Sequence, residues 1–278
     1  MQPRILNPRA AADPVGYMDA VRRTEFGRAY KRKALGLLDL QRGHSVLDVG
    51  CGPGDEAIRF ARVVGRQGRA VGIDTHDLMI EEARRRADQL GSTAEFAVVD
   101  GSDLEFLDAS FDRCYADRVF QLLGDKQRAA IAEIARVLKP GGTLVACAPD
   151  PGSFLIDIGE REVTPKILSF IGGRGWQGRE LPNLLKDGGL IELSIAHCSG
   201  SDTNFQRVDS NTPLATLAKW ARDAEAITER ELSVWLSCLE RAVARDRFFF
   251  GSTMLVVRGT KPRLDSAFLI PDGSCTEG

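Results

Sequence analysis

The feature that most constrains this chain is a glycine-rich turn, VLDVGCGPG, at residues 46–54. An apolar run typical of a buried strand leads into the turn, and a pattern typical of an amphipathic helix follows it. Glycines at 50, 52 and 54 allow a tight turn and let the backbone approach a ligand without a Cβ in the way. A strand, a glycine-rich turn and a helix in this order predict an α/β protein that binds a ligand at the turn.

The surrounding sequence, from Ser45 to Ala148, alternates short β-rich runs with amphipathic patterns, which is the signature of βαβ units and a parallel sheet. The expected strands are Ser45–Val49, Ala70–Asp74, Ala94–Val99, Arg113–Ala116 and Thr143–Ala148. The expected helices are Asp55–Val64, Asp77–Leu90 and Asp125–Leu138. Glycine or proline follows each helix, as is common where helices end.

The chain is expected to divide into four segments. Residues 1–40 predict an N-terminal helical lid, and residues 41–150 a Rossmann-like ligand-binding core. Residues 151–260 predict the rest of the sheet and a helical insertion, and residues 261–278 a loose polar tail. Within the third segment we expect a helix near Glu180–Lys186, a strand at Leu190–His197, the helical insertion at about Pro213–Arg245 and a strand at Ser252–Gly259.

Basic residues are dense in the predicted N-terminal helices between Tyr17 and Leu40. We interpret them as a solvated helix face, because charged runs usually face water. The residues are Arg22, Arg23, Arg28, Lys31, Arg32 and Lys33.

The overall charge gives no reason to expect a nucleic acid or an anionic membrane as partner, since the formal net charge is −2 and the pI is near 6.0. The sequence has no uncharged apolar stretch of membrane-spanning length and no apolar run like that of a signal peptide. The six cysteines form no CxxC pair or metal-ligand cluster, so no metal is expected. We expect a cytoplasmic protein without a membrane span, and leave a homo-oligomer open.

Two aspartates stand at the ends of predicted strands. Asp74 follows the second strand, where a carboxylate can accept hydrogen bonds from two ribose hydroxyls, and Asp100 follows the third. Open α/β sheets bind ligands at the carboxyl ends of their strands. The turn and Asp74 alone would also fit a dinucleotide site.

These motifs, together with Met79 and with RVLKPGG at residues 136–142, resemble the class I S-adenosylmethionine (SAM) dependent methyltransferases. The chain is most similar to the small-molecule group related to ubiquinone and menaquinone biosynthesis methyltransferases. The resemblance is strong over residues 17–150 and weaker afterwards. It implies a Rossmann-like, doubly wound, seven-stranded sheet with N-terminal helices and a helical cap, and it implies SAM as the cofactor.

The resemblance also implies roles for individual residues. Gly50 and Gly52 would line the methionine moiety, Asp74 would hold the ribose, and Asp100 would bind the adenine amine. Asp117, after the fourth strand, would face the methionine amino group and the transferred methyl. The full expected cofactor set is Asp48, Gly50, Gly52, Gly54, Asp74, Thr75, Met79, Asp100, Gly101, Ser102 and Asp117.

Three residues are candidates for catalysis: Tyr17, Asp117 and Asp150. Strand ends in this topology face the substrate, which favours the two aspartates. Tyr17 and Tyr30 lie thirteen positions apart in the N-terminal segment. Since that spacing does not place them on one helix face, we expect at most one at the site and choose Tyr17.

The expected function is methyl transfer from SAM to a small, apolar metabolite of the quinone or natural-product type, on a carbon, nitrogen or oxygen acceptor. Aromatic residues after Asp150 supply material for an apolar pocket roof: Phe154, Phe170, Trp176, Phe205, Trp220 and Trp235. The sequence does not separate this activity from a cyclisation on the same fold, with or without methyl transfer. A dinucleotide-dependent oxidoreductase is a weaker alternative, and the motifs of DNA methyltransferases are absent.

Overall fold

The computed structural model describes residues 13–173, 178–209 and 212–263. Its strands are β1 (Ser45–Val49), β2 (Arg69–Asp74), β3 (Glu95–Val98), β4 (Phe111–Asp117), β5 (Leu138–Asp157), β6 (Ile191–Asp202) and β7 (Phe249–Thr260). Its α-helices are α1 (Pro14–Arg23), α2 (Glu25–Leu38), α3 (Asp55–Val64), α4 (Asp77–Leu90), α5 (Phe120–Leu123), α6 (Gln127–Val137), α7 (Thr164–Gly173), α8 (Leu181–Asp187), α9 (Phe205–Asp209), α10 (Leu214–Asp223) and α11 (Glu229–Ala244).

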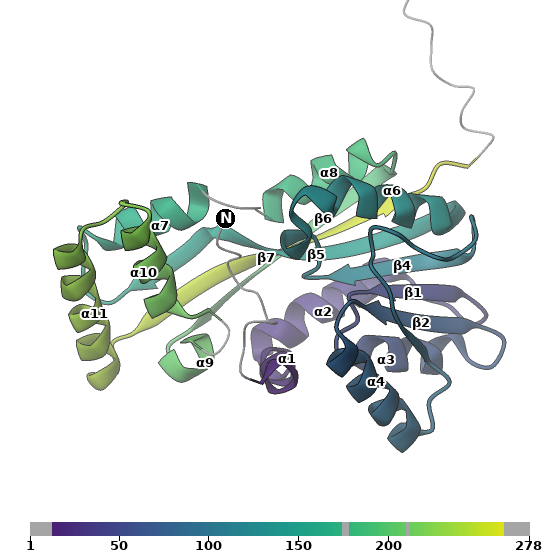
Figure 1. The fold of residues 1–278 in the computed structure, drawn as a ribbon, viewed down its shortest axis with the longest axis horizontal. Helices are drawn as coiled ribbons and strands as arrows, with labels where there is room; N and C mark the ends of the chain where they lie inside the picture. The colour runs from purple at the N-terminus through teal and green to yellow at the C-terminus, as the bar shows by residue number, and fades with distance from the viewer. Residues whose placement is uncertain (1–12, 174–177, 210–211, 264–278) are drawn as a thin grey trace, which may run out of the picture.

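The strands form one seven-stranded sheet in the order β3-β2-β1-β4-β5-β7-β6, with helices on both faces (Figure 1). β1 to β5 are parallel, and β7 runs antiparallel to both β5 and β6. The predicted fold class is therefore confirmed. The strand order reverses between β1 and β4, so their carboxyl ends open a crevice where such sheets bind ligands.

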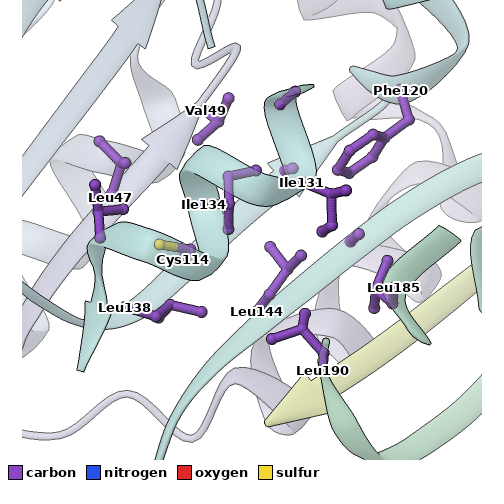
Figure 2. Close-up of a cluster of buried hydrophobic side chains, with 14 of the residues drawn as sticks. Leu47, Val49, Cys114, Phe120, Ile131, Ile134, Leu138, Leu144, Leu185 and Leu190 are labelled. Atoms are coloured by element: carbon purple, nitrogen blue, oxygen red, sulfur yellow. The ribbon is translucent and has the colours of Figure 1, made fainter. Parts of the chain in front are cut away.

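Alternate residues of β1 supply the two faces of the sheet with apolar side chains. Leu47 and Val49 join the cluster formed with α6 and α8, which Figure 2 shows in close-up. Val46 faces the other way and packs with residues of α2 and α3. Strands buried on both faces explain why the sequence reads as continuous apolar runs here.

A second apolar core lies where β5 and β7 extend beyond the other parallel strands, at the end of the molecule that carries α7, α10 and α11 (Figure 1). We call it the satellite core: residues of α7, α10 and α11 with the adjoining ends of β5 and β7. Trp235 is fully buried in it and donates from Nε1 to Thr164 Oγ1 at 3.0 Å. The predicted insertion at about 213–245 corresponds to α10 and α11, which begin and end inside it.

Two differences from the sequence-based expectation concern the second half of the chain, and one expected segment lies outside the described residues. β5, β6 and β7 each extend beyond the predicted range, and β5 continues past a register shift between Asp150 and Leu155. The helices α7 and α9 were not predicted. The predicted tail lies outside the described residues from position 264 onward.

The N-terminal segment forms two helices, because Thr24 adopts an extended conformation between them and caps α2 through its hydroxyl. The interpretation of the basic residues as a solvated face is wrong for Lys31. Its side chain is 13% exposed and its Nζ lies 3.0 Å from Glu56 Oε1. Within the described part of the chain, no helix is both long and apolar enough to cross a membrane.

Candidate active site

The glycine-rich turn after β1 has a backbone that side chains would obstruct. Gly50 has φ of 68°, and a Cβ added there would lie 2.5 Å from Val119 Cγ2. Gly54 has φ of 83°, and a Cβ there would lie 2.7 Å from the Cβ of Ala83 in α4. The first glycine therefore opens the space between β1 and the segment after β4, whereas the third allows α3 and α4 to pack closely.

Asp74, at the end of β2, is held by two backbone amides. Its Oδ2 accepts from Gly52 N at 3.1 Å and its Oδ1 accepts from His76 N at 3.0 Å. The carboxylate thus links the glycine-rich turn to the start of α4. Helix α4 begins at Asp77, as predicted.

Asp100 follows β3 and forms the next acidic position along the edge of the sheet. Its Oδ1 accepts from Ser102 N at 2.9 Å and Ser102 Oγ at 2.7 Å, and its Oδ2 lies 2.7 Å from Lys126 Nζ. The hydrogen bond from Lys126, with those from Ser102, lowers the pKa of Asp100 to about 2. Asp100 is therefore ionised at neutral pH.

Asp117 ends β4 and lies among buried polar groups. Its Oδ2 accepts from Tyr30 Oη at 3.0 Å and lies 3.4 Å from Lys31 Nζ, whereas its buried Oδ1 has no hydrogen-bond partner among the residues that the structure describes. Arg118 Nε, 3.7 Å from that Oδ1, and Gln121 Oε1 are also buried without a hydrogen bond to any described residue. Buried polar atoms without partners are costly in a finished core and point to a ligand.

A cavity of about 640 Å³ connects these strand ends with the far ends of β5, β6 and β7. Nine of the predicted site residues line it: Tyr17, Gly50, Gly52, Asp74, Thr75, Met79, Asp100, Gly101 and Asp117. Four others are absent from its described lining: Asp48, Gly54, Ser102 and Asp150. Ser102 still acts on the cavity through its hydrogen bonds to Asp100.

Asp48 and Asp150 are both buried, and neither belongs to the described lining of the cavity. Asp48 is 3% exposed, and burial together with the nearby Glu56 raises its pKa well above the ordinary value. Asp150 forms a bidentate pair with Arg179, at 3.0 and 2.7 Å. Its neighbour Pro149 lines the cavity, because successive residues of a strand face opposite sides.

Both N-terminal tyrosines line the cavity, so the expectation that at most one reaches it is wrong. The spacing argument assumed one helix, whereas Tyr17 lies on α1 and Tyr30 on α2. Tyr30 is fully buried and is the one that hydrogen-bonds Asp117.

Arg118 is the functional candidate that the sequence analysis missed. It lines the cavity with a side chain 14% exposed, and its φ of 60° is rare for a residue with a side chain. Strained backbone of this kind is concentrated at functional sites. An arginine directly after a strand-end aspartate was visible in the sequence, but its burial was not.

These residues fit S-adenosylmethionine. Asp117 Oδ1 and Gln121 Oε1 can accept from an ammonium, and the Arg118 guanidinium matches a carboxylate. Asp74 and Asp100 offer carboxylates at the ends of two further strands. Gly50 and Gly52 leave room for the ligand between the turn and α1, where Met18 Cε is the nearest atom to a Cβ added at Gly52, at 3.4 Å.

Comparisons with known proteins agree with this geometry. A family model described as a methyltransferase domain matches residues 46–142. An uncharacterised 37.1 kDa protein in transposon TN4556 of Streptomyces fradiae is 34% identical over 252 residues, covering 89% of this chain and 71% of that protein. The ubiquinone/menaquinone biosynthesis C-methyltransferase UbiE of Enterobacter sp. (strain 638) is 30% identical over 166 residues, covering 57% and 66%.

Among solved structures, the YcgJ protein from Bacillus subtilis superposes with a TM-score of 0.58 at 20% identity, over 84% of this chain and 99% of that one. That likeness concerns the fold alone. The domain match, the named relatives and the placement of glycines and carboxylates at the strand ends support one conclusion. The chain belongs to the class I S-adenosylmethionine-dependent methyltransferases.

Proposed function

We propose that this methyltransferase acts on a small, largely apolar metabolite of the quinone or natural-product type. The observation that carries the proposal is the extent of the cavity. It continues from Gly50, Asp74 and Asp117 into a chamber whose apolar lining consists of Phe26, Phe154, Val208, Phe250 and Met254. Pockets lined by aromatic and aliphatic side chains bind apolar ligands.

A few polar residues interrupt the apolar lining and provide means of orienting an acceptor, and they include the ion pair of Asp202 with Arg207. Ser201, Thr212, Ser252 and Thr253 all contribute to the wall. A small number of polar groups in an apolar chamber fixes orientation more than it adds affinity. The chamber therefore suits a flat or compact apolar body that carries one or two oxygen or nitrogen atoms.

The relative UbiE is named as a ubiquinone/menaquinone biosynthesis C-methyltransferase, which supports an apolar acceptor. The match covers 57% of this chain and 66% of that protein. This chain forms its chamber with residues around β7. We therefore carry over the class of acceptor and leave the acceptor itself to experiment.

The protein's own contribution to the reaction is alignment and exclusion of water. SAM supplies a methyl group on a positively charged sulfur, ready for in-line attack. Asp117 and Arg118 would hold the methionine end, and Asp74 the ribose, so that the methyl faces the apolar chamber. Tyr17 and Met18 on α1 line the cavity beside the turn and would keep water from the reacting atoms.

The acidic groups of the chamber favour an acceptor that needs little help to lose a proton. Asp202 lines the chamber, but Arg207 holds its carboxylate at 2.8 and 2.9 Å and lowers its pKa. A carboxylate held in this way is a weak base. Phenols, acidic carbons and amines therefore fit the site better than aliphatic alcohols.

The test is a transfer assay with methyl-labelled SAM and panels of quinone, polyketide, terpenoid and alkaloid scaffolds, read by product mass. The proposal expects a product heavier by one CH₂ from an apolar scaffold, and a Phe250→Ala variant with lower kcat/KM for that acceptor but unchanged SAM affinity. A product of unchanged mass would instead indicate cyclisation. Transfer confined to polar, charged acceptors would contradict the proposal.

A further inference from the structure

The two oxygens of the Asp117 carboxylate have unequal surroundings. Oδ2 accepts from Tyr30 Oη at 3.0 Å and lies 3.4 Å from Lys31 Nζ. Oδ1 is buried and has no hydrogen-bond partner within the described ranges of the chain, and Arg118 Nε lies 3.7 Å from it. Two consecutive residues of α2 therefore occupy one oxygen and leave the other to a further donor, and Asp117 itself lines the cavity.

Lys31 is itself fixed from the opposite side. Its Nζ lies 3.0 Å from Glu56 Oε1, and the side chains of both residues are nearly buried. Burial alone would favour the neutral amine, but Asp117 and Glu56 outweigh it and raise the pKa of Lys31. Lys31 is therefore a positively charged neighbour of Asp117 Oδ2 at physiological pH.

The Tyr30 hydroxyl stays protonated at physiological pH and can therefore donate a hydrogen bond to Asp117. The tyrosine ring is fully buried, and burial raises the pKa of its hydroxyl far above the ordinary value. A neutral hydroxyl beside a carboxylate donates its proton to the carboxylate oxygen. The direction of this hydrogen bond is therefore fixed.

Helix α2 is packed closely against the sheet. Tyr30, Ala34 and Leu38 are buried against the sheet, and Phe26 packs against Gly200 of β6, where a Cβ would collide with the phenylalanine ring. A donor pair on so firmly packed a helix holds its target in one rotamer. The N-terminal segment thus reaches the site through α2 as well as α1.

We infer that Tyr30 and Lys31 are positioning residues, which hold Asp117 so that its Oδ1 receives the ammonium group of the cofactor's methionine moiety. The inference rests on the proposed role of Asp117 in cofactor binding. It assigns the pair no contact with the transferred methyl. If the pair only stabilised the fold, its removal would affect all adenosine ligands alike, whether or not they carry the ammonium group.

The experiment compares three adenosine ligands by calorimetry. S-adenosylhomocysteine carries the ammonium and the carboxylate, its decarboxylated analogue keeps only the amine, and 5′-methylthioadenosine has neither. For Tyr30→Phe we expect about tenfold weaker binding of the first two and unchanged binding of the third, since one hydrogen bond to a charged group is removed. Lys31→Met should show the same pattern.

Tyr115→Phe is the matched control, because Tyr115 is equally buried and, among the described residues, its hydroxyl makes no hydrogen bond to Asp117 and only a long one with Cys147 Sγ, at 4.0 Å. It should change none of the three affinities. In an Asp117→Asn background, Tyr30→Phe should have little further effect, because the pair acts through that carboxylate. Equal weakening of all three ligands, or no weakening in Tyr30→Phe, would overturn the inference.

Failure of the inference can be told from failure of the proposed site. If Asp117→Asn binds S-adenosylhomocysteine as tightly as the unaltered protein, Asp117 does not hold the ammonium and the underlying proposal is wrong. If Asp117→Asn weakens binding and Tyr30→Phe does not, only the positioning role is wrong. Lys31→Met removes the cation that pairs with Glu56 and can therefore impair folding. If Lys31→Met does not fold, Tyr30→Phe decides the question.

Discussion

Asp74 has two backbone amides bound to its carboxylate and faces the cavity, so its removal should affect the ligand more than the fold. For Asp74→Ala we expect SAM affinity to fall by about tenfold to a few hundredfold, because one or two hydrogen bonds to a charged group are lost. Calorimetry with S-adenosylhomocysteine measures this. Asp88→Ala, an exposed aspartate of α4, is the control. Unchanged affinity in a folded Asp74→Ala protein would exclude the residue from the site.

Asp150 was a catalytic candidate, and its geometry predicts a different outcome. Asp150→Asn weakens the bidentate pair with Arg179, whose own side chain is 59% exposed. After allowance for solvent screening, we expect a loss of about 1–2 kcal/mol in the free energy of unfolding. Urea denaturation measures this loss, and kcat should stay within about twofold. A large fall in kcat without a loss of stability would restore the catalytic hypothesis.

At the scale of elements, α1 is fastened to the core by a cluster of charges. Arg86 of α4 reaches Asp19 of α1 at 3.0 Å, Asp55 of α3 at 2.8 Å and Glu82 at 2.7 Å. Arg22 of α1 reaches Asp55 at 3.1 Å. These contacts support the proposal that the N-terminal segment acts as a lid, because they hold Tyr17 and Met18 over the cavity.

Replacing Arg86 with methionine should release α1, since three carboxylates lose their shared cation. We expect faster hydrogen exchange over residues 14–23, faster dissociation of S-adenosylhomocysteine, and a loss of about 1–3 kcal/mol in the free energy of unfolding. Arg85→Met is the matched control, because Arg85 is more exposed and pairs only with Glu82 among the described residues. If both variants release ligand at the unaltered rate, α1 is not held by this cluster.

The elements that the sequence predicted well are those whose signal is local. Strands β1 to β4 and helices α3, α4 and α6 lie close to the predicted ranges, because apolar periodicity and terminal glycines are read within a few residues. Helix α7 was missed although Ile167, Phe170 and Ile171 have helical spacing, since the glycines after them favoured a loop. The core of β5 was predicted as Thr143–Ala148, but its extension to Asp157 was not, because Pro149 and Gly152 interrupt its apolar run.

At the scale of the whole molecule, two apolar cores share the wall of one cavity. Phe154 and Phe250 belong to the satellite core and also line the cavity. The described residues of α10 and α11 are not part of that lining. The insertion at about 213–245 therefore acts on the acceptor chamber indirectly, by packing against Phe154 and Phe250, and is not itself the cap over the substrate.

Trp235→Leu tests this arrangement, because it removes a fully buried ring and its hydrogen bond to Thr164. We expect a loss of about 2–4 kcal/mol in the stability of the satellite core, seen as faster hydrogen exchange in α7 and α11. Acceptor kcat/KM should fall while S-adenosylhomocysteine affinity stays unchanged. Equal loss of both would show that the two cores are not separable.

The site divides in the same way between what the sequence could and could not predict. Gly50, Asp74 and Asp100 stand at strand ends, so their convergence follows from the order of strands. Phe26, Gly200 and Met254 are far apart in the chain and meet only because α2 crosses β6 and β7. No periodicity within the sequence carries that information, and the same holds for the contact between Tyr30 and Asp117.

The central place of β7 has a consequence for how the protein is made. β7 follows every other strand along the chain, yet it lies between β5 and β6 in the sheet. A ribosome releases residues in sequence order, and nascent segments fold as they emerge. The wall with Gly50 and Asp74 is therefore synthesised well before the wall with Phe250 and Met254. The first residues proposed to hold the cofactor therefore leave the ribosome before those proposed to line the acceptor chamber, and α2 can take its final place only once β6 and β7 have been made.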